Sequence, residues 1–344
     1  MSFPNFYGNA AVAEALANMI RNDRIPQTIL LAGSEGVGKA TLARRFAAAL
    51  LGDAEKIELD DLSLPEKVEH LAEREKLPSD KRADDPLLYS SHPDFITFPP
   101  DGPLRQISIQ QMRLLKDRAQ FAPIKGRYRV FLIDHLDRAN EQAANSLLKI
   151  TEEPPDHLIL ILTAQNVYDL LPTIRSRSLI FHLNALTEEE MAAFARSRGW
   201  SPTERRVTLA AGAPGLAVTL DIEAWDKRRQ RMVALLEVAS GIEKFSGWVK
   251  HSETISASKT EKLDTYLLIL YGLLEDILLL REGSPARRNS DLTAKLQPIA
   301  VRTSFEWLEA AVERVDELVE FARRNIQKGI ALDAFAVDLR RRNT

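Results

Sequence analysis

The sequence contains no cysteine among its 344 residues. This absence excludes disulfide bonds and zinc sites built on thiolates, and it fits a protein of the reducing cytoplasm. The six histidines are scattered along the chain without the short spacing that ligands of one metal ion usually share. We therefore expect no bound zinc and no other histidine-based metal site.

A basic excess and a long apolar run are also missing. The formal net charge is −3, whereas a protein that binds DNA tightly by itself usually carries a basic face. Tight DNA binding by the lone chain is therefore not expected. The longest apolar stretch, 267–280, is interrupted by Glu275 and Asp276, which favours a buried helix over a membrane span. The first 25 residues carry charges and a helical period instead of the apolar core of a signal peptide, so we expect a cytoplasmic protein without membrane contact.

The first half of the chain alternates strand and helix patterns. Apolar runs predict buried strands at 27–33, 94–99, 129–134, 158–163 and 178–182. Helical patterns precede or separate them at 10–22, 42–51, 107–119 and 139–152. Such alternation predicts an α/β domain, a parallel sheet with helices on both faces. Residues 53–91 are acidic and punctuated by proline, and we interpret them as an insertion containing one short helix.

Strand patterns end near residue 184. Thr187 with Glu190, and Ser201 with Glu204, have the spacing of capping boxes that open short helices. Long helical patterns then follow at 223–240, 260–282 and 304–327. We therefore predict three domains: an α/β domain at 1–184, a small helical domain at 185–223 and an all-helical domain at 224–344.

A glycine-rich loop, GSEGVGKAT, occupies 33–41, directly after the first predicted strand. This is the Walker A form, in which backbone N–H groups near the glycines approach phosphate and Lys39 reaches the outer phosphates. The strict pattern puts a hydroxyl after the lysine to hold Mg²⁺. Here Ala40 stands at that place, and Thr41 lies about 100° further round the helix. Two interpretations remain open: a weak or vestigial site for ATP or ADP with Mg²⁺, and a structural turn without nucleotide. The residues of such a site would be Gly33, Gly36, Gly38, Lys39, Ala40 and Thr41.

The strand at 129–134 has the Walker B form. Asp134, at its carboxyl end, is placed to orient Mg²⁺ through the metal's water shell. Hydrolytic proteins of this class carry a glutamate next, to orient the attacking water, but this chain has His135. The catalytic position is either lost, which we favour, or filled by a histidine that acts as base.

Several motifs in fixed order carry a family resemblance. After the Walker A loop come HPD at 92–94, ISIQQMR at 107–113, AANSLLK at 143–149, EEPP at 152–155 and LLPTIRSRS at 170–178. Together they resemble the clamp-loader branch of the AAA+ family, and most closely its bacterial DNA polymerase III delta-prime members. The strong part of the resemblance covers about the first 185 residues. The helical remainder agrees in layout, and Asn325 with IALDAFAVDL at 330–339 resembles the end of the family's collar domain.

The resemblance implies a fold and residue roles. The expected fold is an AAA+ P-loop parallel-sheet domain with a small helical lid domain and an all-helical C-terminal collar domain. Arg177, beside Ser176, takes the position of an arginine finger directed at the γ-phosphate of an adjacent subunit. A permanently charged guanidinium suits that role. Without the surrounding motif, Arg175 and Arg177 would be interpreted as a solvated pair. Thr163 takes the family's first sensor position, beside the degenerate nucleotide site.

Three departures from the family pattern matter. The zinc module that most relatives carry after the P-loop is replaced by the cysteine-free insertion at 53–91. The second-sensor arginine is absent, because Gly215 and Leu216 stand at its place. The hydroxyl and the glutamate of a hydrolytic site are missing as well. These departures predict a largely non-hydrolytic subunit.

The resemblance also implies partners. They are the DnaX-type (tau/gamma) ATPase subunits, the delta subunit, the sliding clamp, and primer-template DNA through the complex. A catalytically active AAA+ ATPase subunit is the alternative. A P-loop nucleotide kinase is disfavoured by the length of the chain, by the three-domain layout and by the motif block at 126–178.

Overall fold

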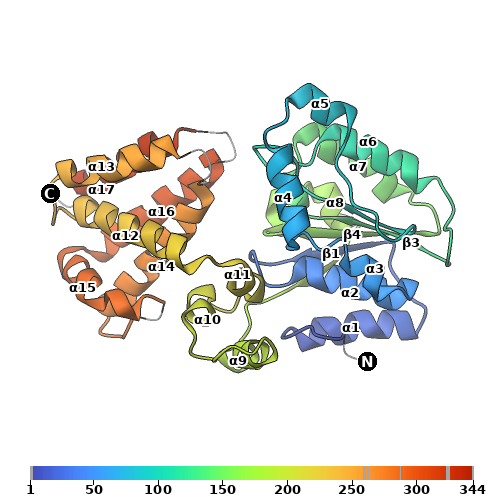
Figure 1. The fold of residues 1–344 in the computed structure, drawn as a ribbon, viewed down its shortest axis with the longest axis horizontal. Helices are drawn as coiled ribbons and strands as arrows, with labels where there is room; N and C mark the ends of the chain where they lie inside the picture. The colour runs from blue at the N-terminus through green and yellow to red at the C-terminus, as the bar shows by residue number, and fades with distance from the viewer. Residues whose placement is uncertain (1–2, 259–260, 262, 287, 323–325, 343–344) are drawn as a thin grey trace. The chain divides into compact units, whose positions relative to one another are not determined.

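The computed structural model describes all residues except 1–2, 259–260, 262, 287, 323–325 and 343–344 (Figure 1). Asn325, named above for its resemblance to the collar domain, lies outside the described residues. The chain divides into two compact units, Met1–Thr219 and Leu220–Thr344.

The first unit is built on five strands, all paired in parallel. They are β1 (Thr28–Ala32), β2 (Phe95–Phe98), β3 (Arg129–Ile133), β4 (Leu158–Ala164) and β5 (Leu179–His182), in the order β2-β3-β4-β1-β5. Every residue of β1 to β4 is buried, as expected for strands covered on both faces. β5 is an edge strand and is partly exposed. All five predicted strands are present, but β5 is not buried as predicted, because it lies at the edge of the sheet.

Helices cover both faces of the sheet (Figure 1). α1 (Ala10–Arg21) and α2 (Lys39–Leu51) share one apolar core with the sheet, in which Leu16 and Phe46 are fully buried. α6 (Ile109–Ala119) and α7 (Glu141–Glu152) share the core of the opposite face, through Met112 and Leu147. The predicted α/β architecture, a parallel sheet with helices on both faces, is confirmed.

The insertion at 53–91 forms three short helices where the sequence predicted one. They are α3 (Ala54–Glu58), α4 (Pro65–Arg74) and α5 (Ser79–Asp84). Arg74 is buried and donates to the carboxylate of Asp101 at 2.6 Å and to that of Asp85 at 3.0 Å. A second ion pair joins Arg44 of α2 to Asp61 at 2.5 Å. Ion pairs therefore tie the segment to the domain.

Short helices follow the sheet strands. The structure has 3-10 turns at Leu136–Arg138 and Val167–Asp169, and helices α8 (Pro172–Ser176), α9 (Glu188–Ser197), α10 (Arg205–Ala210) and α11 (Pro214–Thr219). Thr187 and Glu190 form the predicted capping box of α9. The second predicted box is wrong, because α10 begins only after Glu204. The Ser201 hydroxyl instead pairs with that of Thr203 at 3.0 Å.

Residues 185–219 have an apolar cluster of their own, formed by Leu186, Met191, Phe194, Ala195, Val207, Ala210 and Ala217. They nevertheless belong to the first compact unit. The division into three domains with boundaries near 184 and 224 stays a prediction.

The second unit is helical. Its elements are α12 (Ile222–Ala239), α13 (Phe245–Ala257), α14 (Leu263–Arg281), a 3-10 turn at Ser290–Leu292, α15 (Thr293–Arg302), α16 (Phe305–Ala322) and α17 (Lys328–Arg342). Trp248 and Trp307 are fully buried, and their indole N–H groups donate to Asp333 Oδ1 at 2.6 Å and to the Leu339 carbonyl at 3.0 Å. The buried helix predicted around 267–280 is α14. None of the described helices has the length and apolarity needed to cross a membrane.

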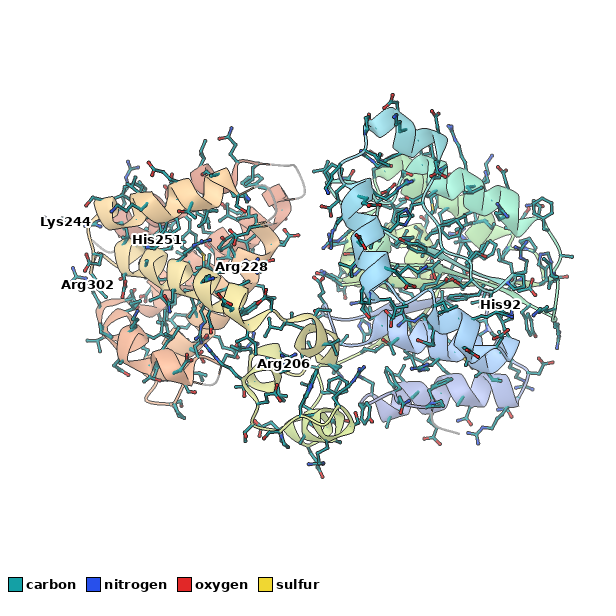
Figure 2. The ribbon with its side chains drawn as sticks, viewed as in Figure 1. His92, Arg206, Arg228, Lys244, His251 and Arg302 are labelled. Carbon is teal, nitrogen blue, oxygen red and sulfur yellow. The ribbon has the colours of Figure 1, made fainter. Side chains whose placement is uncertain are left out.

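The HPD motif at 92–94 organises the loop that precedes β3. The buried Asp94 carboxylate accepts from the backbone N–H groups of Ile124 and Lys125, both at 2.7 Å. His92, labelled in Figure 2, is buried and accepts the Asp94 N–H on its Nδ1 at 3.1 Å. This bond requires an unprotonated Nδ1, and burial lowers the pKa of His92 below its usual value of 6.5.

A pH dependence of stability follows from His92. Because its folded-state pKa is depressed, the stability that it contributes is present above about pH 6.5 and is lost as pH falls through the folded-state pKa. We expect the free energy of unfolding to drop below pH 6.5 by up to about 1.4 kcal/mol per pH unit from this group. His92→Gln should show a shallower decline between pH 7 and pH 5 in urea unfolding. His182→Gln, at an exposed position of β5, should keep the wild-type slope. Equal slopes for all three proteins would contradict the assignment.

Candidate functional site

The carboxyl ends of the central strands bring three predicted positions together. The glycine-rich loop follows β1, Asp134 follows β3 and Thr163 lies near the end of β4. The Thr163 hydroxyl donates to Asp134 Oδ1 at 2.6 Å and accepts the backbone N–H of His135 at 2.7 Å. In an open parallel sheet this edge is where ligands bind. The predicted site residues of the Walker A and Walker B segments thus share one place in the fold.

Lys39 is engaged by its own loop. It is the first residue of α2 and is 5% exposed. Its Nζ donates to the carbonyl of Gly33 at 2.6 Å and to that of Ser34 at 2.8 Å. Burial lowers the pKa of Lys39, while the charges of Asp134 and Asp137 oppose that shift. The ammonium that would reach an outer phosphate is therefore bonded to protein carbonyls in this arrangement.

The loop is also packed against two other segments of the first unit. The N–H of Gly215, in α11, donates to the Gly36 carbonyl at 2.8 Å, and a Cβ on Gly36 would lie 2.9 Å from the backbone nitrogen of Leu216. On the other side, a Cβ on Gly38 would lie 3.3 Å from the ring of Phe6. Both glycines have a positive φ, of 79° and 101°. Only glycine suits the close approach of α11 at Gly36.

The positions that distinguish a hydrolytic site hold other groups. Ala40, which has no hydroxyl, and Thr41 are the second and third residues of α2. His135 adopts a left-handed backbone conformation with φ 55°. Its Nδ1 lies 3.9 Å from Asp137 Oδ1, beyond hydrogen-bonding distance. The residues therefore fit bound MgATP poorly, and the nucleotide site stays a prediction.

Arg177 is displayed at the end of α8. This short helix is anchored by Ile174, which is fully buried, and Arg177 directly follows its last residue. The guanidinium Nη1 donates to the Thr173 carbonyl at 3.0 Å, and Nη2 lies 3.2 Å from Glu152 Oε1. The Arg177 side chain is 37% exposed. The hydroxyl of Ser176 also donates to the Thr173 carbonyl, at 3.1 Å. The structure thus places the predicted finger on a fixed turn and within reach of solvent.

Two contacts near these residues were not predicted. Sequence reasoning named Glu152 only as part of the EEPP motif, and nothing in the 24 residues between it and Arg177 indicates that the two side chains meet. Arg175, interpreted as a solvated residue, has its guanidinium 5.2 Å from the ring centre of Tyr168, which is 78% exposed. The contact of Gly215 with Gly36 likewise joins segments far apart in the sequence. Each of these contacts depends on tertiary structure alone.

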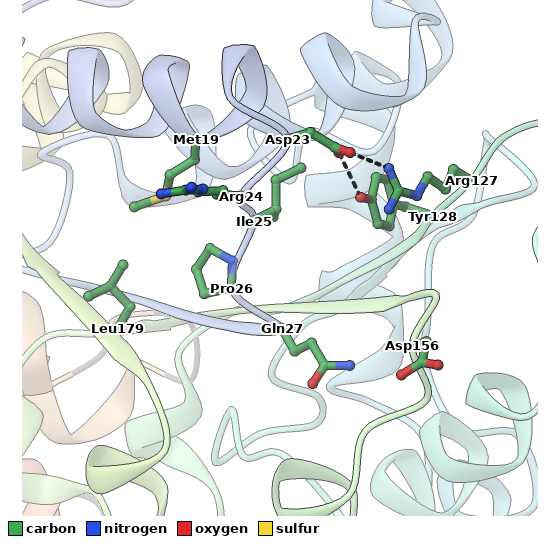
Figure 3. A pocket seen from close by; sticks show the side chains of 10 residues that line it. All are labelled: Met19, Asp23, Arg24, Ile25, Pro26, Gln27, Arg127, Tyr128, Asp156 and Leu179. Carbon is green, nitrogen blue, oxygen red and sulfur yellow. Dashed lines mark hydrogen bonds and ion pairs between the residues drawn. The ribbon is translucent and has the colours of Figure 1, made fainter.

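A pocket of about 590 Å³ lies at the opposite edge of the sheet, where the strands begin (Figure 3). The Asp23 carboxylate accepts from Arg127 at 2.5 Å and from the Tyr128 hydroxyl at 3.1 Å beside it. The pocket is lined by Met19, Asp23, Arg24, Ile25, Pro26, Gln27, Arg127, Tyr128, Asp156 and Leu179. None of these is a predicted site residue. Among the described residues, no group of three or more His, Asp or Glu side chains is arranged to hold a metal ion.

The fold is that of a P-loop protein of the AAA+ class. A model of the family described as "DNA polymerase III, delta subunit" matches residues 8–187. The chain belongs to this family, and with it to the clamp-loader branch of AAA+ proteins.

Curated relatives agree with this assignment. The DNA polymerase III subunit gamma of Buchnera aphidicola subsp. Schizaphis graminum is 33% identical over 196 residues, which cover 57% of this chain and 48% of that protein. The DNA polymerase III subunit tau of Escherichia coli K12 is 31% identical over 191 residues, covering 55% of this chain and 26% of that protein. The chain thus spans about half the length, or less, of these relatives.

Solved structures with weaker likeness were also found. A DNA polymerase III gamma subunit-related protein from Thermotoga maritima shares 17% identity, with 96% of this chain and 99% of that chain covered, at a TM-score of 0.41. The RuvB Holliday junction branch migration motor of the same organism shares 16% identity, with 87% and 89% covered, also at 0.41. Neither likeness is strong enough to carry an inference about function.

Proposed function

We propose that this chain is a delta-prime-type subunit of a bacterial DNA polymerase III clamp loader. In this role it hydrolyses little or no ATP and supplies Arg177 to the ATP site of a neighbouring subunit. Its partners would be the gamma/tau ATPase subunits, the delta subunit and the sliding clamp, with primer-template DNA contacted through the complex. The relatives named gamma and tau and the family match over 8–187 support membership of the same assembly.

One observation carries the choice of a non-hydrolytic subunit, namely the contrast between the two candidate sites. Groups of the P-loop are hydrogen-bonded within the protein. Lys39 donates to loop carbonyls, and the Gly36 carbonyl accepts from the N–H of Gly215. Arg177, in contrast, is more than a third exposed at the end of an anchored helix. The chain is therefore poorly arranged to use a phosphate of its own, while the exposed guanidinium of Arg177 keeps N–H donors for a phosphate held elsewhere.

The chemistry of such a finger is electrostatic. In phosphoryl transfer, negative charge spreads over the oxygens of the transferring group, and an arginine supplied in trans stabilises that charge. The guanidinium is permanently charged and its planar fork matches phosphate geometry. The vestigial loop would bind ATP or ADP with Mg²⁺ weakly at most, because Ala40 and His135 stand where the metal hydroxyl and the catalytic glutamate belong.

The isolated chain is expected to hydrolyse ATP negligibly. Steady-state phosphate release by the purified protein should equal that of its Lys39→Ala variant, because neither has a competent site. Adding the gamma/tau ATPase subunit of the same bacterium should give turnover that survives Lys39→Ala in this chain. A basal turnover that Lys39→Ala abolishes would contradict the proposal and favour an active ATPase subunit, with His135 as the candidate base.

A further inference from the structure

The guanidinium of Arg177 makes two contacts, a hydrogen bond and an ion pair, with groups that come from two different elements. One is the Thr173 carbonyl in α8, which accepts from Nη1 at 3.0 Å. The other is the carboxylate of Glu152, the last residue of α7, whose Oε1 lies 3.2 Å from Nη2. A hydrogen bond at one terminal nitrogen and an ion pair at the other limit the positions that the planar guanidinium can take.

The residues next to this contact are buried and packed. Thr151, which precedes Glu152, is buried, and its hydroxyl donates to the Leu148 carbonyl at 2.9 Å, one turn earlier in α7. Ile150 and Ile174 belong to the same apolar core, so the end of α7 and the helix α8 are packed together. Glu152 directly follows the two buried residues Ile150 and Thr151, and its side chain is 47% exposed. The Glu152 carboxylate can therefore contact Arg177 while it stays largely exposed to solvent.

The exposure of the pair decides what it can do. Ion pairs between exposed side chains contribute little to folding stability, since solvent screens them. An arginine side chain, however, has considerable rotamer freedom that must be lost when it engages a phosphate. A contact that is weak for stability can still reduce that loss by holding the side chain near one rotamer. A guanidinium also has five N–H groups, so the contacts at Nη1 and Nη2 leave donors for an acceptor from outside.

We propose that Glu152 is a positioning residue for the arginine finger, which it holds through Arg177 Nη2 in the orientation that meets the neighbour's phosphate. This inference rests on the proposed function of Arg177. Glu152 touches no phosphate in this scheme. It acts by limiting the rotamers of Arg177 before the neighbouring subunit docks.

The test is the ATPase activity of a loader reconstituted from this chain with the gamma/tau and delta subunits and the sliding clamp of the same bacterium, on primed DNA. Glu152→Ala should lower the Arg177-dependent part of kcat about three- to tenfold, the scale expected from freeing one arginine side chain. KM for ATP should not change, because the contact matters in the transition state. Glu152→Gln, which keeps an acceptor oxygen, should recover part of the loss.

The chain offers a matched control one residue away. Glu153 is also exposed, and Glu153→Ala removes the same charge from the same helix end without touching Arg177 in the contacts described. It should leave kcat unchanged. In the Arg177→Ala background, Glu152→Ala should have no further effect, because a positioning residue has nothing left to position. A general role in folding or assembly would not produce that dependence.

The possible outcomes separate the two proposals. If Arg177→Ala leaves the loader's ATPase unchanged, both the proposed function and this inference fail. If Arg177→Ala lowers the ATPase but Glu152→Ala matches Glu153→Ala, only this inference fails. An increase in kcat on Glu152→Ala would also overturn it, since Glu152 would then compete with phosphate for the guanidinium.

Discussion

Arg177→Ala is expected to lower the ATPase activity of the assembled clamp loader while leaving this chain folded. The side chain is 37% exposed and its ion-pair partner Glu152 is 47% exposed, so its removal leaves no buried charge unpaired. At the single site that it faces, loss of a trans-acting arginine costs on the order of 10³-fold in related phosphoryl-transfer systems. The total turnover should fall less, because the sites of the other subunits keep their own machinery.

The measurement is steady-state phosphate release by a complex shown by gel filtration to contain the variant. Arg175→Ala is the control, since it removes the same charge two residues away, from a side chain that lies over the Tyr168 ring. Equal losses from both variants would indicate a general electrostatic effect of this surface. Full activity of an assembled Arg177→Ala loader would remove the finger from the mechanism.

The sheet could be predicted from the sequence because its signal is local. Four of the strands are short apolar runs whose residues are all buried, and each ends at a turn or a polar residue. The position of Asp134 after β3, and its meeting with Thr163 at the end of β4, follow from parallel pairing of neighbouring strands. Most residues of the candidate site could therefore be predicted from a strand pattern and the motif that follows it.

The helices of the insertion could not be predicted in the same way. α3 and α5 have five and six residues, too few for a helical period to show. The place of the insertion depends on ion pairs with residues outside it, such as that of Arg44 with Asp61 and that of Asp101 with Arg74. The prediction of a capping box at Ser201 and Glu204 was wrong for a different reason. The spacing was right, but the helix begins at Arg205, so Glu204 precedes the first turn.

The contact between Glu152 and Arg177, and that between Gly215 and Gly36, escaped prediction for a further reason. A family motif names which residues recur, but it does not say which of them touch. Glu152 ends α7 and Arg177 directly follows α8, and their meeting depends on how Ile150 and Ile174 pack in the shared core. The positioning of the finger is thus a property of the folded domain, even though both residues stand in recognisable motifs.

Arg74→Ala is expected to destabilise the insertion by about 3–5 kcal/mol, the usual cost of leaving one member of a buried ion pair alone. The side chain of Arg74 is 4% exposed and that of Asp101 is 7% exposed, and the two are 2.6 Å apart. The hydrogen bond to Asp101 is the main cause that raises the pKa of Arg74. Without the guanidinium, the Asp101 carboxylate would stay buried with only the backbone N–H of Gly102, at 2.7 Å, as a described partner. Urea unfolding should show the loss of stability, and proteolysis within 53–91 should become faster.

Arg105→Ala is the matched control for this prediction. Arg105 pairs with Glu75 at 3.1 Å in the same region, but its side chain is 50% exposed, so its removal should cost less than about 1 kcal/mol. Adding Asp101→Asn to Arg74→Ala should recover part of the loss, because the neutral amide no longer leaves a buried charge without a partner. If Arg74→Ala and Arg105→Ala cost the same, the insertion is not held by its buried arginine. A cost that Asp101→Asn increases further would show instead that Asp101 stabilises the segment independently of Arg74.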